Sequence, residues 1–350
     1  MNVLSLFDGI SCARVALERA GIPVDYYWAS EIDKYAIQIS QKNYPNIARL
    51  GDVKLLDINN YDYFGNGIDL LIGGSPCQDL SIAKKNRKGL DGERSGLFWE
   101  YVRILNQVKP KWFILENVAS MSKESKDTIS KALGVEPIMI NASLVSAQNR
   151  KRLFWTNIHG VTQPEDRGIL LKDILENGDS DRLKSYCIDA NYFKGSSWKH
   201  YKEKGNRQMI LLGNIYPNEG QAGRVYSPEG KSQYLSALSG GGGAKTGLYR
   251  IQQEPHGTAL DYYNDTIVPN GKAKVLGTNP QSTTAVAGQL VNDNFFIRKL
   301  TPIECERLQG LPDNYTEGVS NTQRYKALGN AFNVDVVAHI LSFILNAEKL

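Results

Sequence analysis

Cys77 lies in the stretch DLLIGGSPCQDLS (residues 69–81), in which an apolar segment leads through two glycines and a proline to a thiol. A cysteine attacks as the thiolate, and a free thiol with a pKa of about 8.5 is mostly protonated at neutral pH. A position in the loop after a strand, near the start of a helical turn, would lower that pKa. The stretch by itself fits a buried structural cysteine as well as it fits a nucleophile.

Two other segments carry polar groups at expected strand ends. FILENV brings Glu116 to the end of a strand, where a carboxyl can donate or accept a proton. SAQNRKRLFW places Arg150 and Arg152 two residues apart, so both side chains point to one face if the segment is extended. Such a pair suits a planar acceptor or a phosphate. Each group alone could belong to a surface ion pair, but together with Cys77 they favour a reactive site.

Three further loops offer a turn glycine or a carboxylate. SLFDGISCA places Gly9 between a strand and a helix, where a ligand can approach the backbone. SEID ends the second strand near Glu31, a position that typically accepts hydrogen bonds from a ribose, and GDV adds Asp52. The full GxGxxG diphosphate loop is missing from the sequence, so these loops indicate an adenosyl ligand rather than a nicotinamide dinucleotide.

The elements that must hold these groups alternate along the first part of the chain. The expected strands are 2–7, 24–32, 68–74, 111–117 and 136–145, and the expected helices are 11–21, 33–44 and 96–108. Strands that alternate with helices predict an α/β fold, a doubly wound and mostly parallel sheet covered on both faces.

The pattern changes in residues 160–297, which are rich in Gly, Asn, Ser, Lys and Tyr and predict a smaller, irregular, β-rich domain. Regular structure returns with TPIECERLQGLP, where Thr301 and Pro302 stand in helix-capping positions and Glu304 in the first turn. The apolar helix expected at 333–350 needs a packing partner. We therefore expect a first domain (1–159), an inserted domain (160–297) and a C-terminal return to the first domain (298–350).

Composition excludes several classes of protein. The 350 residues are 41% hydrophobic and 22% charged, with a net charge of +4, as in an ordinary soluble protein. Four scattered cysteines and four histidines form no CxxC pair or zinc-ligand spacing, so we expect no metal, no disulfide framework and a reducing, cytoplasmic location. The N-terminus lacks the basic flank of a signal peptide, and no apolar run approaches the roughly 20 residues of a membrane span.

Read in order, the motifs resemble those of the DNA (cytosine-5)-methyltransferases. The matching segments are FDGI, SEID, GDV, GGSPCQDLS, ENV, QNRKR, RKLTPIECERLQGLP and YKALGNAFNVDVV. The resemblance covers residues 1–158 and 298–350, and SLFDGI and PCQDLS are most similar to the animal de novo enzymes and to small bacterial or phage relatives. Two positions depart from the family pattern: GISCA has small residues where glycines often stand, and Phe332 follows GNA where valine is frequent.

The resemblance implies S-adenosylmethionine as methyl donor, S-adenosylhomocysteine as product, and cytosine in double-stranded DNA as acceptor. It implies that Cys77 forms a covalent adduct with the base and that Glu116 hydrogen-bonds or protonates ring nitrogen 3. Arg152 would hold the base carbonyl, and Arg150 would steady the surrounding network. The cofactor-binding positions that it implies are Phe7, Asp8, Gly9, Ile10, Ser11, Glu31, Ile32, Asp52, Val53, Pro76, Asn330 and Ala331.

The target base must leave the duplex to be reached, so something must cover it. The basic stretch SIAKKNRKGLDGERSG after Cys77 predicts a loop that closes over DNA; a solvated basic loop is the alternative. The DNA contacts expected from it are Ser81, Lys84, Lys85, Arg87 and Lys88. Residues 160–297 stand where the family has its target-recognition domain. We expect a monomer, which could act with a cognate restriction endonuclease or alone.

Three other functions are alternatives to DNA methylation. The same chemistry on a structured RNA is one, but the CFT tripeptide of the family's transfer-RNA branch does not occur in this sequence. A non-catalytic DNA-binding relative is disfavoured because Cys77, Glu116 and both arginines are present. A nicotinamide oxidoreductase is disfavoured by the missing diphosphate loop.

Overall fold

The computed structural model describes residues 1–58, 67–76, 97–178, 180–196, 198–205, 207–213 and 296–347, and short strands between 225 and 290. The chain divides into two compact units. Unit 1 consists of Met1–Ile174, Leu183–Lys194 and Thr301–Leu350, and unit 2 of Leu175–Arg182 and Gly195–Leu300. The roles expected for 1–159, 160–297 and 298–350 remain a prediction.

Unit 1 is built on one sheet of seven described strands in the order β3-β2-β1-β4-β5-β7-β6. The strands are β1 (Asn2–Leu6), β2 (Tyr26–Ser30), β3 (Ala48–Arg49), β4 (Leu70–Gly73), β5 (Trp112–Val118), β6 (Ile138–Asn141) and β7 (Lys151–Thr156). All neighbours pair in parallel except β7, which runs antiparallel to both β5 and β6. Every residue of β1 is buried, as expected for a strand covered on both faces. The predicted α/β fold with a mostly parallel sheet is confirmed.

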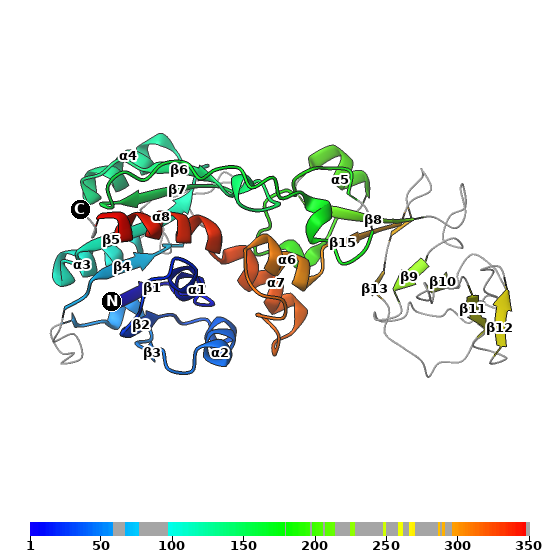
Figure 1. Cartoon of the computed structure of the whole chain (residues 1–350), viewed down its shortest axis with the longest axis horizontal. Helices are drawn as coiled ribbons and strands as arrows, with labels where there is room; N and C mark the ends of the chain where they lie inside the picture. The colour runs from blue at the N-terminus through cyan, green and yellow to red at the C-terminus, as the bar shows by residue number, and fades with distance from the viewer. Residues whose placement is uncertain are drawn as a thin grey trace. The chain divides into compact units, whose positions relative to one another are not determined.

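Four described helices of unit 1 alternate with its strands along the chain, and three more follow one another near the C-terminus (Figure 1). They are α1 (Cys12–Arg19), α2 (Lys34–Asn43), α3 (Leu97–Val108), α4 (Lys123–Leu133), α6 (Pro302–Leu308), α7 (Asn321–Asn330) and α8 (Val334–Ala347), with short 3-10 turns at Val53–Leu55, Ala142–Leu144, Leu171–Ile174 and Tyr192–Lys194. The predicted cap of α6 is confirmed: the Thr301 side chain accepts from the Glu304 amide, and the Glu304 carboxylate accepts from the Thr301 amide.

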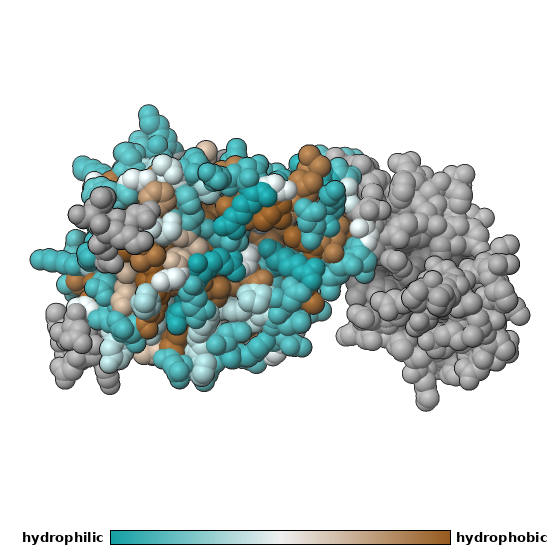
Figure 2. All heavy atoms as spheres, in the orientation of Figure 1, coloured by the Kyte–Doolittle hydropathy of each residue, from teal (hydrophilic) through white to brown (hydrophobic). Residues whose placement is uncertain are grey.

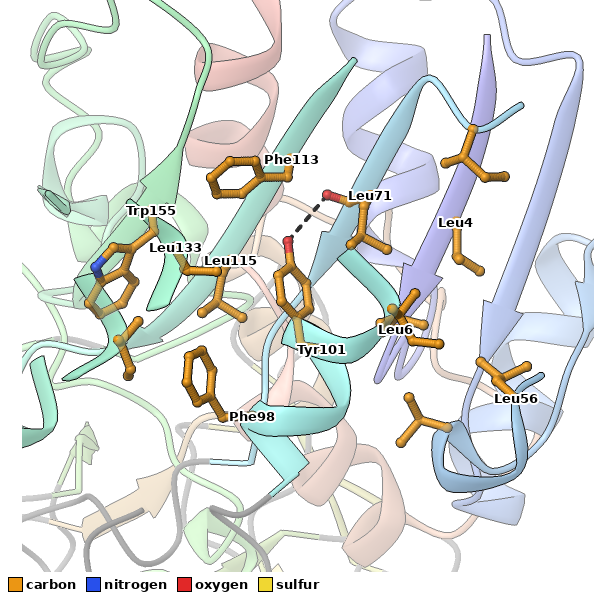
Figure 3. Close-up of a cluster of buried hydrophobic side chains, with 14 of the residues drawn as sticks. Leu4, Leu6, Leu56, Leu71, Phe98, Tyr101, Phe113, Leu115, Leu133 and Trp155 are labelled. Atoms are coloured by element: carbon orange, nitrogen blue, oxygen red, sulfur yellow. Dashed lines mark hydrogen bonds between the residues drawn. The ribbon is translucent and has the colours of Figure 1, made fainter. Parts of the chain in front are cut away.

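One face of the sheet packs against α3 and α4 (Figure 3). Phe98 and Tyr101 of α3 are fully buried against Leu71 of β4 and Leu115 of β5. The Tyr101 hydroxyl reaches two backbone carbonyl oxygens, at 3.4 Å on Leu71 and 3.1 Å on Ile114, so burial of the ring leaves its polar end paired. This packing fixes the relative positions of β4 and β5, whose ends carry the site described below.

The C-terminal helix α8 packs on α1, which brings the last 50 residues of the chain into unit 1 (Figure 1). Among the described residues, the stretch Asn321–Leu345 is long and apolar enough, by length and composition alone, to cross a membrane. However, 72% of its most apolar window is buried inside the fold, as in the core helix of a globular domain. The apolar character of helix α8 is therefore explained by its packing inside the fold.

The described part of unit 2 contains one helix, α5 (Trp198–Lys204), and short strands. These are β8 (Met209–Gly213), β9 (Val225–Ser227), β10 (Leu248–Tyr249), β11 (Thr258–Asp261), β12 (Thr266–Pro269), β13 (Val286–Ala287), β14 (Gln289–Leu290) and β15 (Phe296–Lys299). Strand β15 pairs antiparallel with β8 and β14, and β11 with β12. The expected short-stranded, β-rich character is present in these residues.

On the face drawn in Figure 2, hydrophilic residues cover most of the described surface, with apolar residues visible between them. The large apolar side chains that remain exposed among the described residues are Tyr26, Ile32, Leu55, Trp99, Met139 and Leu183. Ile32 is the one of these that lines the cavity described next.

Candidate active site

The carboxyl ends of β1, β2, β4 and β5 open onto one cavity of about 270 Å³ in unit 1. Parallel strands that end at the same edge of a sheet bring their following loops together, which is where ligands bind in this class of fold. The end of α7 and the residues after it complete the wall. The predicted site residues that line the cavity are Phe7, Asp8, Gly9, Ile10, Glu31, Ile32, Asp52, Val53, Pro76, Glu116, Arg150, Arg152, Asn330 and Ala331.

The predicted positions that do not line the described cavity fall into two groups. Ser11 is fully buried, and its hydroxyl donates to the Asp8 carboxylate instead of facing the cavity. Cys77 and the basic-loop residues Ser81, Lys84, Lys85, Arg87 and Lys88 lie outside the described residues. Pro76, the last described residue before Cys77, lies on the cavity wall.

The turn after β1 is held by the carboxylate at the end of β2. The Gly9 amide donates to Glu31 Oε2 at 2.8 Å, and the amides of Ile32 and Asp33 donate to Glu31 Oε1, each at 2.8 Å. Gly9 has φ +60°, a left-handed conformation that glycine adopts without strain. Glu31 therefore joins two loops of the cavity, and its lone pairs are numerous enough to accept further hydrogen bonds.

The buried carboxylate of Asp8 also stabilises this turn. Its carboxylate accepts from the Tyr27 hydroxyl at 2.7 Å and from Ser11, and the residue is almost completely buried. Burial raises the pKa of the Asp8 carboxyl above its ordinary value, although the hydrogen bonds from Ser11 and Tyr27 act in the opposite direction. The polar atoms of Asp8 are thus used within the protein, and it shapes the turn on which Phe7 and Gly9 meet the cavity.

Glu116 and Arg152 form an ion pair on the cavity wall, with 2.7 Å between Glu116 Oε1 and Arg152 Nε. In the antiparallel pairing of β5 and β7, Glu116 lies opposite Phe154 and Val118 opposite Arg152. Glu116 and Arg152 are therefore diagonal neighbours on one face of the sheet, within reach of a long side chain. Their side chains are 14% and 16% exposed, so the pair is mostly shielded from water but open to a ligand.

Arg150 lies beneath this pair and is 3% exposed. Its Nη1 donates to the Ile188 carbonyl at 3.1 Å, and its Nη2 donates to the carbonyls of Gly329 and Ala331 at 3.2 and 2.8 Å. Burial lowers the pKa of the Arg150 guanidinium, as does the neighbouring Arg152 charge. Arg150, just before β7, thus binds the backbone of residues 188, 329 and 331. These hydrogen bonds stabilise the part of the cavity wall that contains Asn330.

The two glycines before Cys77 are required by close contacts. A Cβ on Gly73 would lie 2.8 Å from the Leu6 carbonyl oxygen. A Cβ on Gly74 would lie 2.8 Å from the ring of Phe332 and 3.2 Å from Glu116 Oε2. A Cβ does not fit at a separation of 2.8 Å, so a side chain at either glycine would displace its neighbours. The backbone at Gly74 therefore lies close to the carboxyl of Glu116.

Asn117, beside Glu116, ties this loop to β5. Its Nδ2 donates to the carbonyl oxygen of Ser75 at 3.3 Å and to the Ser75 hydroxyl at 3.1 Å, and its Oδ1 accepts from the Val118 amide at 2.8 Å. The side chain is 1% exposed. Asn117 therefore fixes the approach to Pro76 and Cys77 from the same strand that presents Glu116.

A family model described as C-5 cytosine-specific DNA methylase matches residues 1–346. The chain belongs to this family. It is a DNA cytosine methyltransferase, as the resemblance of its motifs indicated. Members of this family use S-adenosylmethionine.

Similar proteins occur in bacteria and their phages. The orphan methyltransferase M.SPRI of Bacillus phage SPR is 27% identical over 434 residues, covering 99% of this chain and 98% of that protein. The putative type II methyltransferase M.BsuMIIP of Bacillus subtilis is 24% identical over 438 residues, with the same coverage of 99% and 98%.

Solved structures of low sequence identity share the fold of this methyltransferase. The Entamoeba histolytica methyltransferase EhMeth matches with a TM-score of 0.63 at 16% identity, covering 100% of this chain and 99% of that one. The S. pombe Dnmt2 methyltransferase matches with a TM-score of 0.52 at 18% identity and full coverage of both chains.

Several residues of this methyltransferase contribute to the site without a strong signal in the sequence. Asn117 has no signal beyond its place after Glu116, because its partner is 42 residues away. Lys326 of α7 pairs with Asp33 at 2.6 Å and both line the cavity, although 293 residues separate them. Phe332, one of the departures from the family pattern, also lines the cavity.

Proposed function

We propose that this methyltransferase modifies carbon 5 of a cytosine flipped out of double-stranded DNA, through a covalent bond between Cys77 Sγ and carbon 6 of the base. The observation that carries the proposal is the Glu116–Arg152 ion pair, which lines the cavity together with Pro76. An acid and a planar cation on one wall suit the N3 and carbonyl edge of cytosine. The residue after Pro76 is the thiol.

The chemistry requires a nucleophile, a proton donor and a proton acceptor. Glu116 enters the reaction protonated, having taken up a proton and given up its ion pair with Arg152 as the base binds. The Cys77 thiolate adds to carbon 6, and the C5–C6 π electrons become available at carbon 5 as nitrogen 3 takes the proton from Glu116. Arg152 holds the base carbonyl and so stabilises the electron density that the ring gains. After carbon 5 has gained its methyl group, a base removes the carbon 5 proton. The C6–Sγ bond then breaks, its electron pair returns to sulfur, and Glu116 regains the N3 proton.

S-adenosylmethionine, when bound, supplies the methyl group as an electrophile and leaves as S-adenosylhomocysteine. The residues on the cavity fit such a group. Glu31 has acceptor capacity for ribose hydroxyls, and Ile32, apolar yet 69% exposed, offers a face for an adenine ring. Gly9 leaves the backbone open, since a Cβ at this residue would meet no atom within 4 Å. Asp52 and Asn330 would add polar contacts. None of these roles calls for a metal.

The remaining roles rest on the sequence and on the relatives. We propose that residues 160–297 select the DNA sequence and that the basic loop with Ser81, Lys84, Lys85, Arg87 and Lys88 binds phosphates. The Bacillus phage relatives are named orphan methyltransferases, which favours an enzyme that acts without a cognate endonuclease. We expect a monomer in the bacterial cytoplasm, in line with phage and bacterial relatives.

Covalent trapping tests this proposal. Duplex DNA carrying 5-fluorocytosine in place of cytosine is incubated with the protein and S-adenosylmethionine, and adducts are detected on a denaturing gel. Because fluorine cannot leave as a proton does, the adduct should accumulate. We expect it with the wild type and with Cys305→Ala, whose thiol is buried in α6, but not with Cys77→Ala.

Two outcomes would contradict the proposal. Methyl transfer at the wild-type rate by Cys77→Ala would exclude the covalent route. An adduct with RNA and none with any DNA would move the enzyme to an RNA substrate. Conversion-based sequencing of methylated DNA then gives the recognised sequence.

A further inference from the structure

A second thiol lies against the two arginines of the proposed site. Cys187 Sγ accepts a hydrogen bond from Arg150 Nη1 at 3.3 Å, and Arg152 Nη2 lies 4.0 Å from the same sulfur. Cys187 belongs to unit 1, although the residues before and after its segment belong to unit 2. Neither the reaction proposed above nor the motifs of the sequence assign it a role.

The electrostatic surroundings of Cys187 favour its ionised form. Burial raises the pKa of the Cys187 thiol, but the charges and hydrogen bonds of Arg150 and Arg152 outweigh burial and lower the pKa below its ordinary value of 9.0. Cys12, which also lines the cavity, differs: burial and the nearby Asp8 raise the pKa of its thiol. Arg150 and Arg19 also act on Cys12, but the pKa of its thiol is raised, whereas that of Cys187 is lowered.

The segment that carries this sulfur is fixed by backbone contacts. The Ser185 amide donates to the Ala147 carbonyl at 2.7 Å, and the Asn149 amide donates to the Ser185 carbonyl at 2.9 Å. On the other side, a Cβ on Gly329 would overlap the backbone of Asp189. The sulfur therefore holds a defined position relative to the start of β7.

The two positive charges of the cluster favour an anion beside them. Arg150 and Arg152 are close enough for the charge of Arg152 to lower the pKa of Arg150. Glu116 supplies one negative charge at 2.7 Å from Arg152. The charged groups that the contacts bring to the sulfur are these two arginines, with Glu116 on the far side of Arg152. A thiolate at Cys187 would balance the second guanidinium.

We propose that Cys187 is a positioning residue for methyl transfer, whose sulfur acts as an anion that holds Arg150 and Arg152 in the orientation in which Arg152 meets Glu116 and the target base. The proposal rests on the proposed function of that pair. It assigns Cys187 no bond to the substrate. Its negative charge, rather than its volume, is what the site uses.

The test compares an isosteric neutral variant with a charged one. Cys187→Ser keeps the shape and loses the anion, whereas Cys187→Asp keeps the anion. We expect Cys187→Ser to lower kcat about tenfold, the effect of replacing a charged hydrogen-bond acceptor by a neutral one, and Cys187→Asp to recover part of that loss. Affinity for S-adenosylhomocysteine, measured by calorimetry, should not change, because Arg152 is the arginine that meets the base and Arg150 keeps its hydrogen bonds to the carbonyls of residues 188, 329 and 331. Cys305→Ser serves as the matched control and should keep the wild-type rate.

The outcomes separate this inference from the proposed function. If the wild type traps 5-fluorocytosine DNA and Cys187→Ser turns over as fast as the wild type, the inference is wrong and the proposed function stands. The inference is also wrong if Cys187→Asp is slower than Cys187→Ser, because packing would then be what matters. If the wild type traps no DNA at all, the proposed function itself is contradicted, whatever the Cys187 variants do.

A measurement on the native side chain guards against misfolded variants. In the Cys77→Ala protein, the rate of Cys187 alkylation by iodoacetamide is followed against pH by peptide mass spectrometry. We expect the half-maximal rate at a lower pH than for an unfolded peptide that carries the same cysteine, because the arginines lower the pKa of the Cys187 thiol. Reaction that begins only at or above the pH found for the peptide would overturn the role of the anion.

Discussion

The substitution Asn117→Asp removes one hydrogen-bond donor beside the active site and keeps the shape of the side chain. Asn117 Nδ2 donates to the Ser75 carbonyl oxygen at 3.3 Å and to its hydroxyl at 3.1 Å, and Oδ1 accepts from the Val118 amide at 2.8 Å. An aspartate has the same shape and keeps the bond from Val118. However, it turns a donor into an oxygen that faces the Ser75 carbonyl.

The expected magnitudes follow from these contacts. Loss of the buried donor and the opposition of two acceptors should lower the free energy of unfolding by about 1–3 kcal/mol. The loop that leads to Cys77 would relax away from the carboxylate. A displacement of about 1 Å at a reacting group lowers the rate by roughly 100-fold, so we expect kcat to fall by that order.

The assay pairs methyl transfer with urea unfolding, and Asn157→Asp is the matched control. Asn157 Oδ1 accepts from the Phe113 amide and Nδ2 donates to the Lys111 carbonyl, each at 2.9 Å, at the opposite end of β5 from the cavity. The control should lose stability and keep its kcat. If Asn117→Asp loses stability but keeps kcat, or if both variants lose activity equally, Asn117 does not act by placing the loop.

Three further predictions concern the walls of the cavity. Gly74→Ala should reduce kcat by at least about tenfold in the same assay, because its Cβ would lie 2.8 Å from the ring of Phe332; unchanged activity would refute the close contact. Arg150→Lys should lower the free energy of urea unfolding by about 2–4 kcal/mol, since a lysine cannot serve the separate buried acceptors of the guanidinium; a loss below about 1 kcal/mol would contradict this. For Asp33→Asn, burial raises the pKa of the carboxyl, but Lys326 and backbone amides outweigh it and hold the pKa below 3.8. Because the pKa is lowered in the folded state, the charged carboxylate stabilises the fold above pH 3.8, and this stabilisation is lost as the pH falls through the folded-state pKa. The free energies of urea unfolding of wild type and variant should therefore differ at pH 6 and converge near pH 2.

Much of the fold could be predicted because local patterns specify it. Thr301 and Glu304 cap a helix through contacts three residues apart, so their sequence spacing is sufficient. The helix Lys123–Leu133 has comparable local marks, with Ser122 as N-cap and Gly134 at φ +71° as its end, yet it was not among the helices predicted. The alternation of strands and helices likewise indicates the parallel sheet.

Parts of the site were predictable for the same reason. Glu31 follows β2 and Glu116 lies near the end of β5, and such strand ends share one edge of a parallel sheet whatever the details of packing. Ser11 was expected on the cavity with its neighbours, but it is fully buried and its hydroxyl donates to the Asp8 carboxylate. A run of adjacent residues does not reveal which side chains a tight turn buries.

By itself, the sequence determined the family, most of the alternating strands and helices, and the kinds of chemical group at the strand ends, since each of these is written in short stretches of chain. The tertiary structure alone decided that Arg152 meets Glu116, that Asn117 holds Ser75 and that Cys187 lies against Arg150. These contacts depend on the register of an antiparallel strand and on the docking of a segment 37 residues away. Long-range packing sets such distances, and no local propensity encodes them.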